Sequence, residues 1–410
     1  IPTFGPSKKA ARIEGSKIYA KEFMKINSIP TADFQIFVNG QELLNFFTQH
    51  NCKNYVVKLD GLAGGKGVYL PDDISELENI SEHLEGPLLV EERLYGQEVS
   101  VMAFCNGHDL ELMPQIKDYK RIGDDNKGKN TGGMGAIGPV EILTDLELRQ
   151  LKEHMLKVVK KLQFKGVLYA GIMKTDKGFY ILEFNCRFGD PETQVALNLL
   201  NSDLYDIFIS SVLGKDLQIK WHDKYCANVV LSHIDYPDKK LTAPVEVKKS
   251  TLDGNIKLYW SNPVIYNNNI HTHGGRVASM VNTSNNLYTC LANIYNNIHK
   301  INYEGRYYRR DIGMDYLLSH TNDRKLKIGI ISSSRGTSIV KLLEENNNIE
   351  VIISNKLNGI LDKARAKNIS HVYLPIKNKK EYYHQLANVL MSFDLDLIFA
   401  VGFMNIFPTE

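Results

Sequence analysis

The order of strand-like and helix-like segments changes near residue 323, and this change constrains the fold more than any other feature of the chain. Beyond it, apolar runs typical of strands alternate with amphipathic stretches typical of helices. The strands are expected at 328–332, 349–354, 371–374 and 396–402, and the helices at 337–345, 358–367 and 379–392. Strands separated by helices pair in parallel, so this part is predicted to form a Rossmann-like parallel α/β sheet.

Before this point the chain consists mainly of strands joined by short turns. Apolar runs at 55–59 and 68–70 flank a glycine-dense turn, and those at 167–173 and 179–185 are typical of a hairpin. A long amphipathic helix is expected at 145–163, after the capping pair Thr144 and Glu147, and the pattern becomes β-rich from about residue 224. We therefore predict domains over residues 1–222, 223–320 and 325–410.

Composition narrows the class of protein. Of the 410 residues 43% are hydrophobic and the net charge is +2, which excludes intrinsic disorder and a nucleic-acid partner held by bulk charge. No apolar run approaches the roughly 18–20 residues that span a bilayer, so no membrane partner is expected. The cysteines show no CxxC spacing and number five, which predicts reduced thiols and a cytoplasmic location. Oligomeric state is not readable from these features.

The glycine-dense turn from Asp60 to Val68 carries the most specific chemical signal. Glycines such as Gly64, Gly65 and Gly67 let backbone amides approach a phosphate closely, and Lys66 supplies charge. The turn is not a Walker A loop, because a glycine follows the lysine and a strand follows the turn. A hairpin with a solvated lysine is the alternative. The cost of placing Lys58 within an apolar strand favours an anion partner over that alternative.

A second signal lies on the expected strand 179–185. Alternation places Glu183 and Asn185 on one face, with Arg187 beside them if the strand persists. Two oxygen donors at this spacing suit Mg²⁺ or Mn²⁺ that substrate phosphates also hold, and Arg187 would then neutralise charge on a transferring phosphoryl group. A half-exposed strand with polar residues facing water is an equally open alternative.

Two further segments give weaker signals. The stretch from Glu91 to Glu98 closes a strand, where backbone groups can read an adenine edge and a carboxylate can hold ribose hydroxyls, although a solvated acidic turn explains it too. The basic cluster 117–121 precedes the glycine-rich turn 130–135 and suits a phosphorylated sugar, although charged loops are usually solvated.

Taken together, these motifs resemble the phosphoribosylamine–glycine ligase family of the ATP-grasp superfamily. The resemblance spans about residues 1–320, and its most specific part is the string from Glu183 to Thr193. Other matching segments are Phe4 to Ser7, Glu14 to Lys17, Gly64 to Gly67, Asn130 to Gly135, Gly274 to Val277 and Arg310 to Gly313. The implied fold is an ATP-grasp domain of mixed α/β and α+β character with a small β-rich C-terminal domain.

The resemblance also implies an activity. ATP would phosphorylate glycine, and phosphoribosylamine would attack the glycyl phosphate to give glycinamide ribonucleotide, ADP and phosphate, a step of purine biosynthesis. Matching positions place Lys17, Lys58 and Lys66 at the ATP phosphates, Glu91, Glu92 and Leu94 at the adenine, Glu98 at the ribose, and Glu183 and Asn185 at the metal. They place Asp118, Lys120, Arg121, Asn130, Thr131 and Gly132 on the side of phosphoribosylamine and glycine, with Lys58 and Arg187 as the catalytic pair.

The segment 325–410 resembles the start of the phosphoribosylglycinamide formyltransferase family. The matching residues run from Ile331 to Ser338, from Ile353 to Lys356 and from Gly402 to Phe407, with Ser334 and Ser338 in place of the family's glycine and asparagine. The family binds formyl-tetrahydrofolate, but its formyl-transfer residues are expected beyond Glu410, so formyl transfer by this chain is not expected.

The two resemblances support each other, because the product of the first activity is the substrate of the second. The ligase family carries a further nucleotide-fold domain ahead of the position of Ile1, and histidine where this chain has Tyr119. We therefore expect a fragment of a multifunctional enzyme in which ATP binding without turnover is one outcome. The alternatives are a non-catalytic nucleotide-binding module or scaffold and another ATP-grasp carboxylate–amine ligase.

Overall fold

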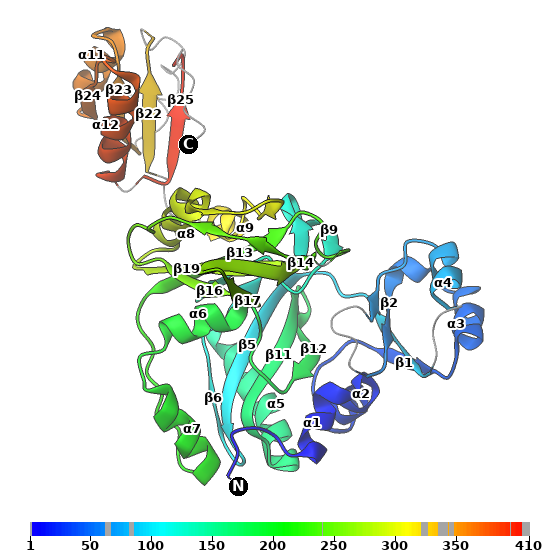
Figure 1. Cartoon of the computed structure of the whole chain (residues 1–410). Coiled ribbons are helices and arrows are strands. Elements are labelled where there is room, and N and C mark those ends of the chain that lie inside the picture. The colour runs from blue at the N-terminus through cyan, green and yellow to red at the C-terminus, as the bar shows by residue number, and fades with distance from the viewer. Residues whose placement is uncertain are drawn as a thin grey trace. The chain divides into compact units, whose positions relative to one another are not determined.

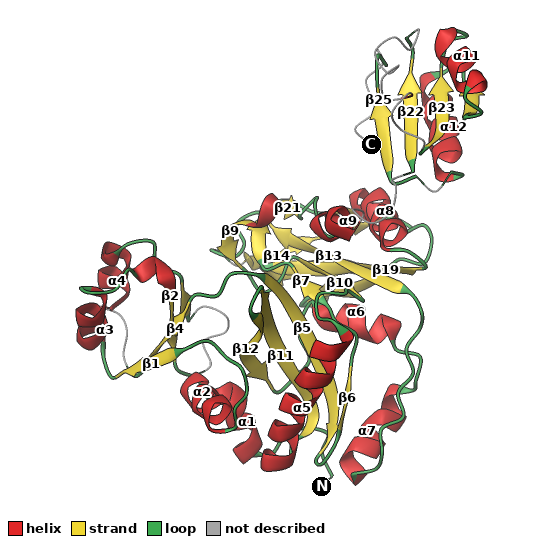
Figure 2. Cartoon of the chain, turned by 180° about the vertical axis from the view of Figure 1, so that it is seen from behind, coloured by secondary structure: helices red, strands yellow, loops and turns green. Residues whose placement is uncertain are grey.

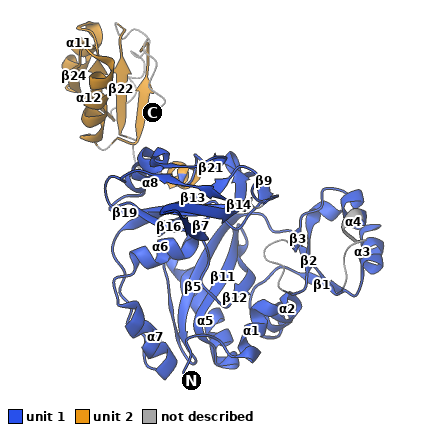
Figure 3. Ribbon diagram, viewed as in Figure 1, with its two compact units in different colours: residues 1–313 blue, residues 314–410 orange. Residues whose placement is uncertain are grey.

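The computed structural model describes most of the chain. The described ranges are 2–61, 67–81, 86–239, 241–320, 327–334, 343, 348–393 and 395–403. They fall into two compact units, Ile1–Gly313 and Met314–Glu410, which Figure 3 colours separately. The helix expected at 337–345 lies outside the described residues except for Leu343. Among the helices that are described, none combines the length and apolar character that a membrane span needs.

The first unit begins with two helices and a small antiparallel sheet (Figure 1). The helices are α1 (Lys8–Gly15) and α2 (Lys17–Ile26), and the sheet has the order β1 (Phe34–Phe37), β4 (Leu88–Glu92), β2 (Tyr55–Leu59), β3 (Val68–Tyr69). Helices α3 (Gly40–Phe47) and α4 (Ile74–Ser81) accompany this sheet, and Leu43, Phe47 and Val57 form part of its core. The predicted strand-loop-strand unit is confirmed, because β2 and β3 pair antiparallel across the glycine-dense turn.

A larger antiparallel sheet follows (Figure 2). Its order is β12 (Gly178–Asn185), β11 (Lys165–Thr175), β5 (Gln97–Asn106), β6 (Leu110–Leu112). The predicted hairpin is confirmed, since β11 and β12 meet at the pair Thr175 and Gly178. Helix α5 (Asp145–Leu162) starts at the predicted capping box, in which Thr144 and Glu147 bond each other's backbone amides. Helix α7 (Leu204–Leu213) packs on β5 and β11.

The β-rich part contributes a second large sheet. Its order is β16 (Lys257–Trp260), β19 (Arg276–Ser284), β13 (Tyr225–His233), β10 (Gly135–Gly138), β7 (Lys117–Asp118), with β21 (Arg306–Tyr307) beside β13. Helices α6 (Glu192–Leu199) and α8 (Leu287–Asn297) cover its opposite faces (Figure 1). Smaller pairings join β8 (Arg121–Gly123) to β9 (Lys127–Asn130), β15 (Lys248–Lys249) to β20 (Ile301–Asn302), and β18 (Asn269–Gly274) to β14 (Leu241–Glu246) and β17 (Pro263–Tyr266).

The second unit contains the predicted parallel sheet. After α9 (Met314–His320), the strand order is β24 (Ser370–Tyr373), β23 (Ile349–Ser354), β22 (Ile328–Ser332), β25 (Leu397–Ala400), and all neighbours pair in parallel. Alternate residues of the strands pack against helix α11 (Gly359–Ala366) on one face and helix α12 (Lys379–Met391) on the other. Both faces of the inner strands are therefore buried, which explains their continuous apolar runs.

Candidate active site

A buried carboxylate flanked by two lysines stands where the small sheet meets α2. Glu91, on β4, is 2% exposed. Its Oε1 lies 2.7 Å from Lys58 Nζ, and its Oε2 lies 2.7 Å from Lys21 Nζ. Burial acts to raise the pKa of Glu91, but Lys58 and Lys21 outweigh it and hold the pKa below its ordinary value. Burial lowers the pKa of Lys21 to about 8.

Lys17 holds the backbone at the start of the glycine-dense turn. Its ammonium group donates to the carbonyl oxygens of Leu59 at 2.8 Å and Gly61 at 2.7 Å. The carboxylate of Asp60 accepts from the Ile18 amide at 3.1 Å, which fixes the start of α2 against the same turn. Lys17 and Lys58 therefore both lie at the start of this turn. The predicted phosphate-loop residues Gly64, Gly65 and Lys66 lie outside the described residues, whereas Gly67 is buried and accepts from the Leu59 amide.

The segment after β4 connects the small sheet to β5. Glu92 is exposed and Leu94 is half-buried. Glu98, the second residue of β5, pairs with Lys120 at 2.8 Å, which lowers the pKa of its carboxyl. Both oxygens of Glu91 meet lysines. The predicted contact with an adenine edge therefore falls to the backbone groups of this strand end.

Glu183 and Asn185 share one face of β12, as predicted, and Asn185 Nδ2 donates to Glu183 Oε1 at 3.3 Å. The charge of Glu183 acts to raise the pKa of both Lys17 and Lys120. Over the described residues, no cluster of three or more His, Cys, Asp or Glu side chains suits a metal ion. An oxygen-donor pair of this kind fits a hard cation that takes its remaining ligands from phosphates.

The strand does not persist to Arg187. It ends at Asn185, and the Arg187 guanidinium donates instead to Glu14 Oε1 at 3.0 Å and to the Phe188 carbonyl at 3.1 Å. Its side chain is 59% exposed. The contribution of Arg187 to phosphoryl transfer stays a prediction, and this ion pair would have to open for it.

The glycine-rich turn 130–135, which we call the substrate loop, is held by contacts with Lys120, Tyr236 and Arg276. Thr131 donates to the Lys120 carbonyl through its amide and its hydroxyl, at 2.7 and 2.8 Å. The amide of Gly132 donates to Tyr236 Oη at 2.8 Å, and its carbonyl accepts from Arg276 at 2.7 Å. Arg121 and Asn130 are the paired ends of β8 and β9, which lead into the loop. Sequence reasoning missed Tyr236 as a site residue, and quoted Arg276 only as part of a motif.

Asp118 lies beside this loop and is half-buried. Asp118 Oδ1 is buried and has no hydrogen-bond partner among the described residues. Asp118 lines a small cavity with Glu98, Ser100 and Lys120. Burial and then the nearby charge of Glu192 raise the pKa of Asp118 well above its ordinary value.

Glu192 itself is 3% exposed and accepts hydrogen bonds from Ser100 Oγ at 3.1 Å and Tyr169 Oη at 2.9 Å. These three side chains come from α6, β5 and β11, and sequence reasoning did not single any of them out as functional. Glu192 could have been identified as a candidate site residue, because it belongs to the string from Glu183 to Thr193 that carries the most specific part of the resemblance.

We expect Asp118→Asn to stabilise the free protein while lowering its activity. The folded state raises the pKa of this carboxyl, so folding is penalised wherever the unfolded chain has it ionised, above about pH 4. Removing that penalty is expected to add about 1 kcal/mol at pH 7. Replacement of the carboxyl group by an amide, which cannot ionise, is expected to lower turnover about tenfold. Thermal unfolding at several pH values measures the first effect, and the stability gap should close toward pH 4. A less stable variant at pH 7 would contradict the prediction.

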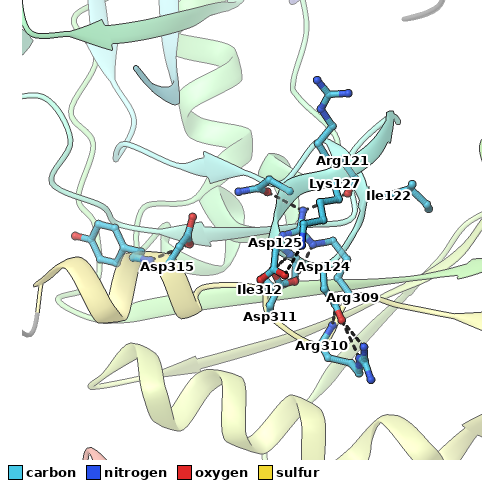
Figure 4. Close-up of polar contacts among 12 residues, drawn as sticks. Arg121, Ile122, Asp124, Asp125, Lys127, Arg309, Arg310, Asp311, Ile312 and Asp315 are labelled. Atoms are coloured by element: carbon cyan, nitrogen blue, oxygen red, sulfur yellow. Dashed lines mark hydrogen bonds and ion pairs between the residues drawn. The ribbon is translucent and has the colours of Figure 1, made fainter. Parts of the chain in front are cut away.

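A fully buried arginine anchors the β8–β9 hairpin (Figure 4). Arg309 forms two hydrogen bonds with the Asp311 carboxylate, both at 2.8 Å. It also donates to the Arg121 carbonyl at 3.2 Å and to Asn126 Oδ1 at 2.9 Å. Its guanidinium lies 5.1 Å from the ring centre of Tyr119, the residue that stands where the resemblance implies histidine. The C-terminal part of the first unit therefore fixes a hairpin that leads to the substrate loop.

Two neighbouring contacts extend this network. Arg310 Nη2 lies 2.7 Å from Asp124 Oδ2, and the Asp125 amide donates to Asp311 Oδ2 at 2.8 Å (Figure 4). Asp125 adopts a φ of 56°, in the left-handed region, so these contacts hold the tip of the hairpin in a backbone conformation that costs energy without them.

The small sheet, the large antiparallel sheet and the lysine clusters between them define the first unit as an ATP-grasp protein. Two family models match the chain. The phosphoribosylglycinamide synthetase ATP-grasp (A) domain matches residues 15–193, and the C domain of the same family matches residues 226–315. The chain belongs to the phosphoribosylamine–glycine ligase family, which confirms the first resemblance.

Individual relatives agree with this assignment. The phosphoribosylamine–glycine ligase of Caldanaerobacter subterraneus is 38% identical over 338 residues, which cover 77% of this chain and 79% of the relative. A crystal structure of the Thermotoga maritima ligase has a TM-score of 0.68 and 35% identity, and the match covers 75% of this chain and 81% of that one. A biotin carboxylase domain from Hydrogenobacter thermophilus, 15% identical with a TM-score of 0.61 over 79% of this chain and 73% of its own, shares the fold.

A longer relative also matches. The bifunctional purine biosynthetic protein of Dictyostelium discoideum is 37% identical over 377 residues, which cover 79% of this chain. The chain spans only 45% of that relative. Family membership therefore rests on the ligase matches above, whose lengths the chain covers more fully.

Proposed function

We propose that the chain catalyses the ATP-dependent ligation of glycine to 5-phosphoribosylamine, giving glycinamide ribonucleotide, ADP and phosphate. The observation that carries this proposal is the position of Glu183. Glu183 accepts a hydrogen bond from Asn185 on one face of β12, and its charge acts on Lys17 at the glycine-dense turn and on Lys120 before the substrate loop. A pair of metal ligands close to positive groups suits phosphoryl transfer to a carboxylate, because the metal ion and the lysines can stabilise the charge on the transferring group.

The chemistry has two steps. A carboxylate oxygen of glycine attacks the γ-phosphorus, and the bond to the ADP oxygen breaks. The amine of phosphoribosylamine then attacks the glycyl carbon, loses a proton and displaces phosphate. Glycyl phosphate hydrolyses readily, so the site must exclude water between the steps. No nucleophilic side chain is needed for this route.

The residue assignments form part of the proposal. Lys17, Lys58 and Lys66 are assigned to the ATP phosphates, and Gly64, Gly65 and Gly67 to the loop that covers them. The strand end with Glu91, Glu92 and Leu94 is assigned to the adenine, and Glu98 to the ribose. Glu183 and Asn185 would hold Mg²⁺, which neutralises phosphate charge when bound. Asp118, Lys120, Arg121, Asn130, Thr131 and Gly132 are assigned to glycine and phosphoribosylamine, and Arg187 to the transferring phosphoryl group.

Phosphate release tests the ligase against other ATP-grasp chemistries. We expect release to require ATP, glycine and phosphoribosylamine together, with Mg²⁺ present, and to stop when any one is omitted. Replacing glycine with alanine or serine should give little release. ATP binding with no release under the complete mixture would favour a non-catalytic nucleotide-binding module.

We also propose that the second unit is a formyltransferase-type domain fused to the ligase. The serines that follow β22 support this, since they lie at the carboxyl end of a parallel sheet, where such sheets bind ligands. Ser333 is 9% exposed, and its hydroxyl has no hydrogen-bond partner among the described residues. The ligand would be the phosphate of glycinamide ribonucleotide. Titration calorimetry should show a site for it that Ser333→Asp removes by charge repulsion. Unchanged binding would contradict the assignment.

We also propose three domains, over residues 1–222, 223–320 and 325–410, from the changes of strand and helix pattern along the sequence. A cytoplasmic location is proposed as well, supported by the cysteines, all of which are free thiols. The proposed partners are small molecules only.

A further inference from the structure

Three charged side chains, Lys21, Lys58 and Glu91, form one buried cluster beside the proposed ATP site. Glu91 and Lys21 are each 2% exposed and Lys58 is 8% exposed. Each oxygen of the carboxylate meets one ammonium group at 2.7 Å. Two positive charges and one negative charge leave a net charge of +1. Burying an excess charge is costly unless an anion compensates it, so this cluster is suited to a phosphate.

The two lysines are not equivalent. Lys21, on α2, donates to Thr31 Oγ1 at 2.6 Å, and Thr31 Oγ1 in turn donates to the Ile181 carbonyl at 2.7 Å. This chain of contacts fixes the Lys21 ammonium between α2 and β12, away from solvent. Lys58 stands on β2 opposite Val68, the first residue of the strand that follows the glycine-dense turn. Lys58 therefore lies beside the strand that follows this turn, whereas Lys21 contacts Glu91 and Thr31.

We propose that Lys21 is a positioning residue for nucleotide binding, which holds the Glu91 carboxylate permanently so that the Lys58 ammonium is available to the ATP phosphates. The inference rests on the proposed function. It adds a residue that touches no substrate and that acts through Glu91 on Lys58.

The electrostatics give the direction of the effect. The Lys21 ammonium offsets the charge of Glu91, so that Lys58 and a nearby phosphate experience less of the negative charge of the carboxylate. Without Lys21, the whole charge of Glu91 faces Lys58 and the local net charge falls from +1 to zero. Lys58 is then neutralised within the protein and is a poorer partner for phosphate. Removing the carboxylate as well restores a local charge of +1.

The test is a set of binding titrations on the full chain with a non-hydrolysable ATP analogue and Mg²⁺. We expect Lys21→Met to raise the Kd about tenfold. Adding Glu91→Gln to Lys21→Met should restore most of the lost affinity. If Lys21→Met acted only by disturbing the packing, the second substitution would not restore affinity. Lys25→Met is the matched control, because Lys25 lies one helical turn further along α2, is exposed, and carries the same charge.

The turnover of the same variants separates positioning from general damage. Lys21→Met should raise KM for ATP with a smaller change in kcat. The inference would be overturned if Glu91→Gln failed to restore affinity in the Lys21→Met background. A folded Lys21→Met chain with unchanged affinity would also overturn it. If Lys21→Met alone does not fold, the double variant compared with Glu91→Gln alone decides, and the two should bind within about threefold of each other. Failure of the unchanged chain to bind the analogue would refute the proposed function instead.

Discussion

Replacing Glu183 with alanine is expected to abolish Mg²⁺-dependent phosphate release, with a loss of about a thousandfold or more. The variant removes the carboxylate whose charge acts on Lys17 and Lys120, and it leaves Asn185 as the remaining proposed metal ligand on β12. A single amide oxygen is too weak a ligand to hold a divalent cation beside a triphosphate. Coupled measurement of released phosphate over a Mg²⁺ titration tests this directly.

Glu153→Ala is the matched control for that variant, because Glu153 is exposed on α5. Its turnover and Mg²⁺ dependence should equal those of the unchanged chain. Thermal unfolding should show that Glu183→Ala still folds, since the carboxylate is only half-buried. A folded Glu183→Ala chain with unchanged turnover would remove the metal assignment.

Replacing Arg309 with methionine is expected to have the largest effect on stability, a loss of about 3–5 kcal/mol. The guanidinium is fully buried, and its removal leaves the Asp311 carboxylate without its paired hydrogen bonds. It also removes the donors to Arg121 and Asn126 that hold the β8–β9 hairpin. Urea unfolding of the variant should show a lower midpoint.

The neighbouring arginine provides the control. Arg310 has an exposed side chain and pairs with Asp124, so Arg310→Met should leave the urea midpoint close to that of the unchanged chain. Under conditions where Arg309→Met still folds, its KM for phosphoribosylamine should rise more than its KM for ATP, because the hairpin leads to the substrate loop and not to the lysine cluster. Equal midpoints for the two variants would show that the network does not stabilise the fold.

Local patterns in the sequence were sufficient for much of the fold. The capping pair Thr144 and Glu147 sets the start of α5, because a capping box acts within one helical turn. The hairpin of β11 and β12 follows from two apolar runs around a short turn. The parallel sheet of the second unit follows from strict alternation of strands and helices.

The site was less accessible, because its side chains come together from distant parts of the chain. Lys21 meets Glu91 from another element, and Arg309 meets Arg121 from a separation of 188 residues. The spacing of residues along the sequence does not predict such pairs. Lys21 carried one usable signal, since it lies one helical turn after Lys17 on α2 beside the buried residues Phe23 and Met24.

Arg187 shows the opposite difficulty. Its spacing from Glu183 and Asn185 indicated a shared strand face, but β12 ends at Asn185 and Glu14 takes the guanidinium. The end of β12 is set by its pairing with β11, and the last pair is Asn185 with Tyr169. A single sequence does not reveal where such pairing stops.

The most direct test of the proposed reaction is the fate of the glycine oxygens. Glycine labelled with ¹⁸O in its carboxylate should transfer one labelled oxygen to each phosphate released, because the carboxylate oxygen bonded to phosphorus leaves with it. Mass spectrometry of the phosphate measures the transfer, and glycinamide ribonucleotide should retain the other labelled oxygen. Phosphate released without label, in a mixture that forms glycinamide ribonucleotide, would contradict the glycyl phosphate route.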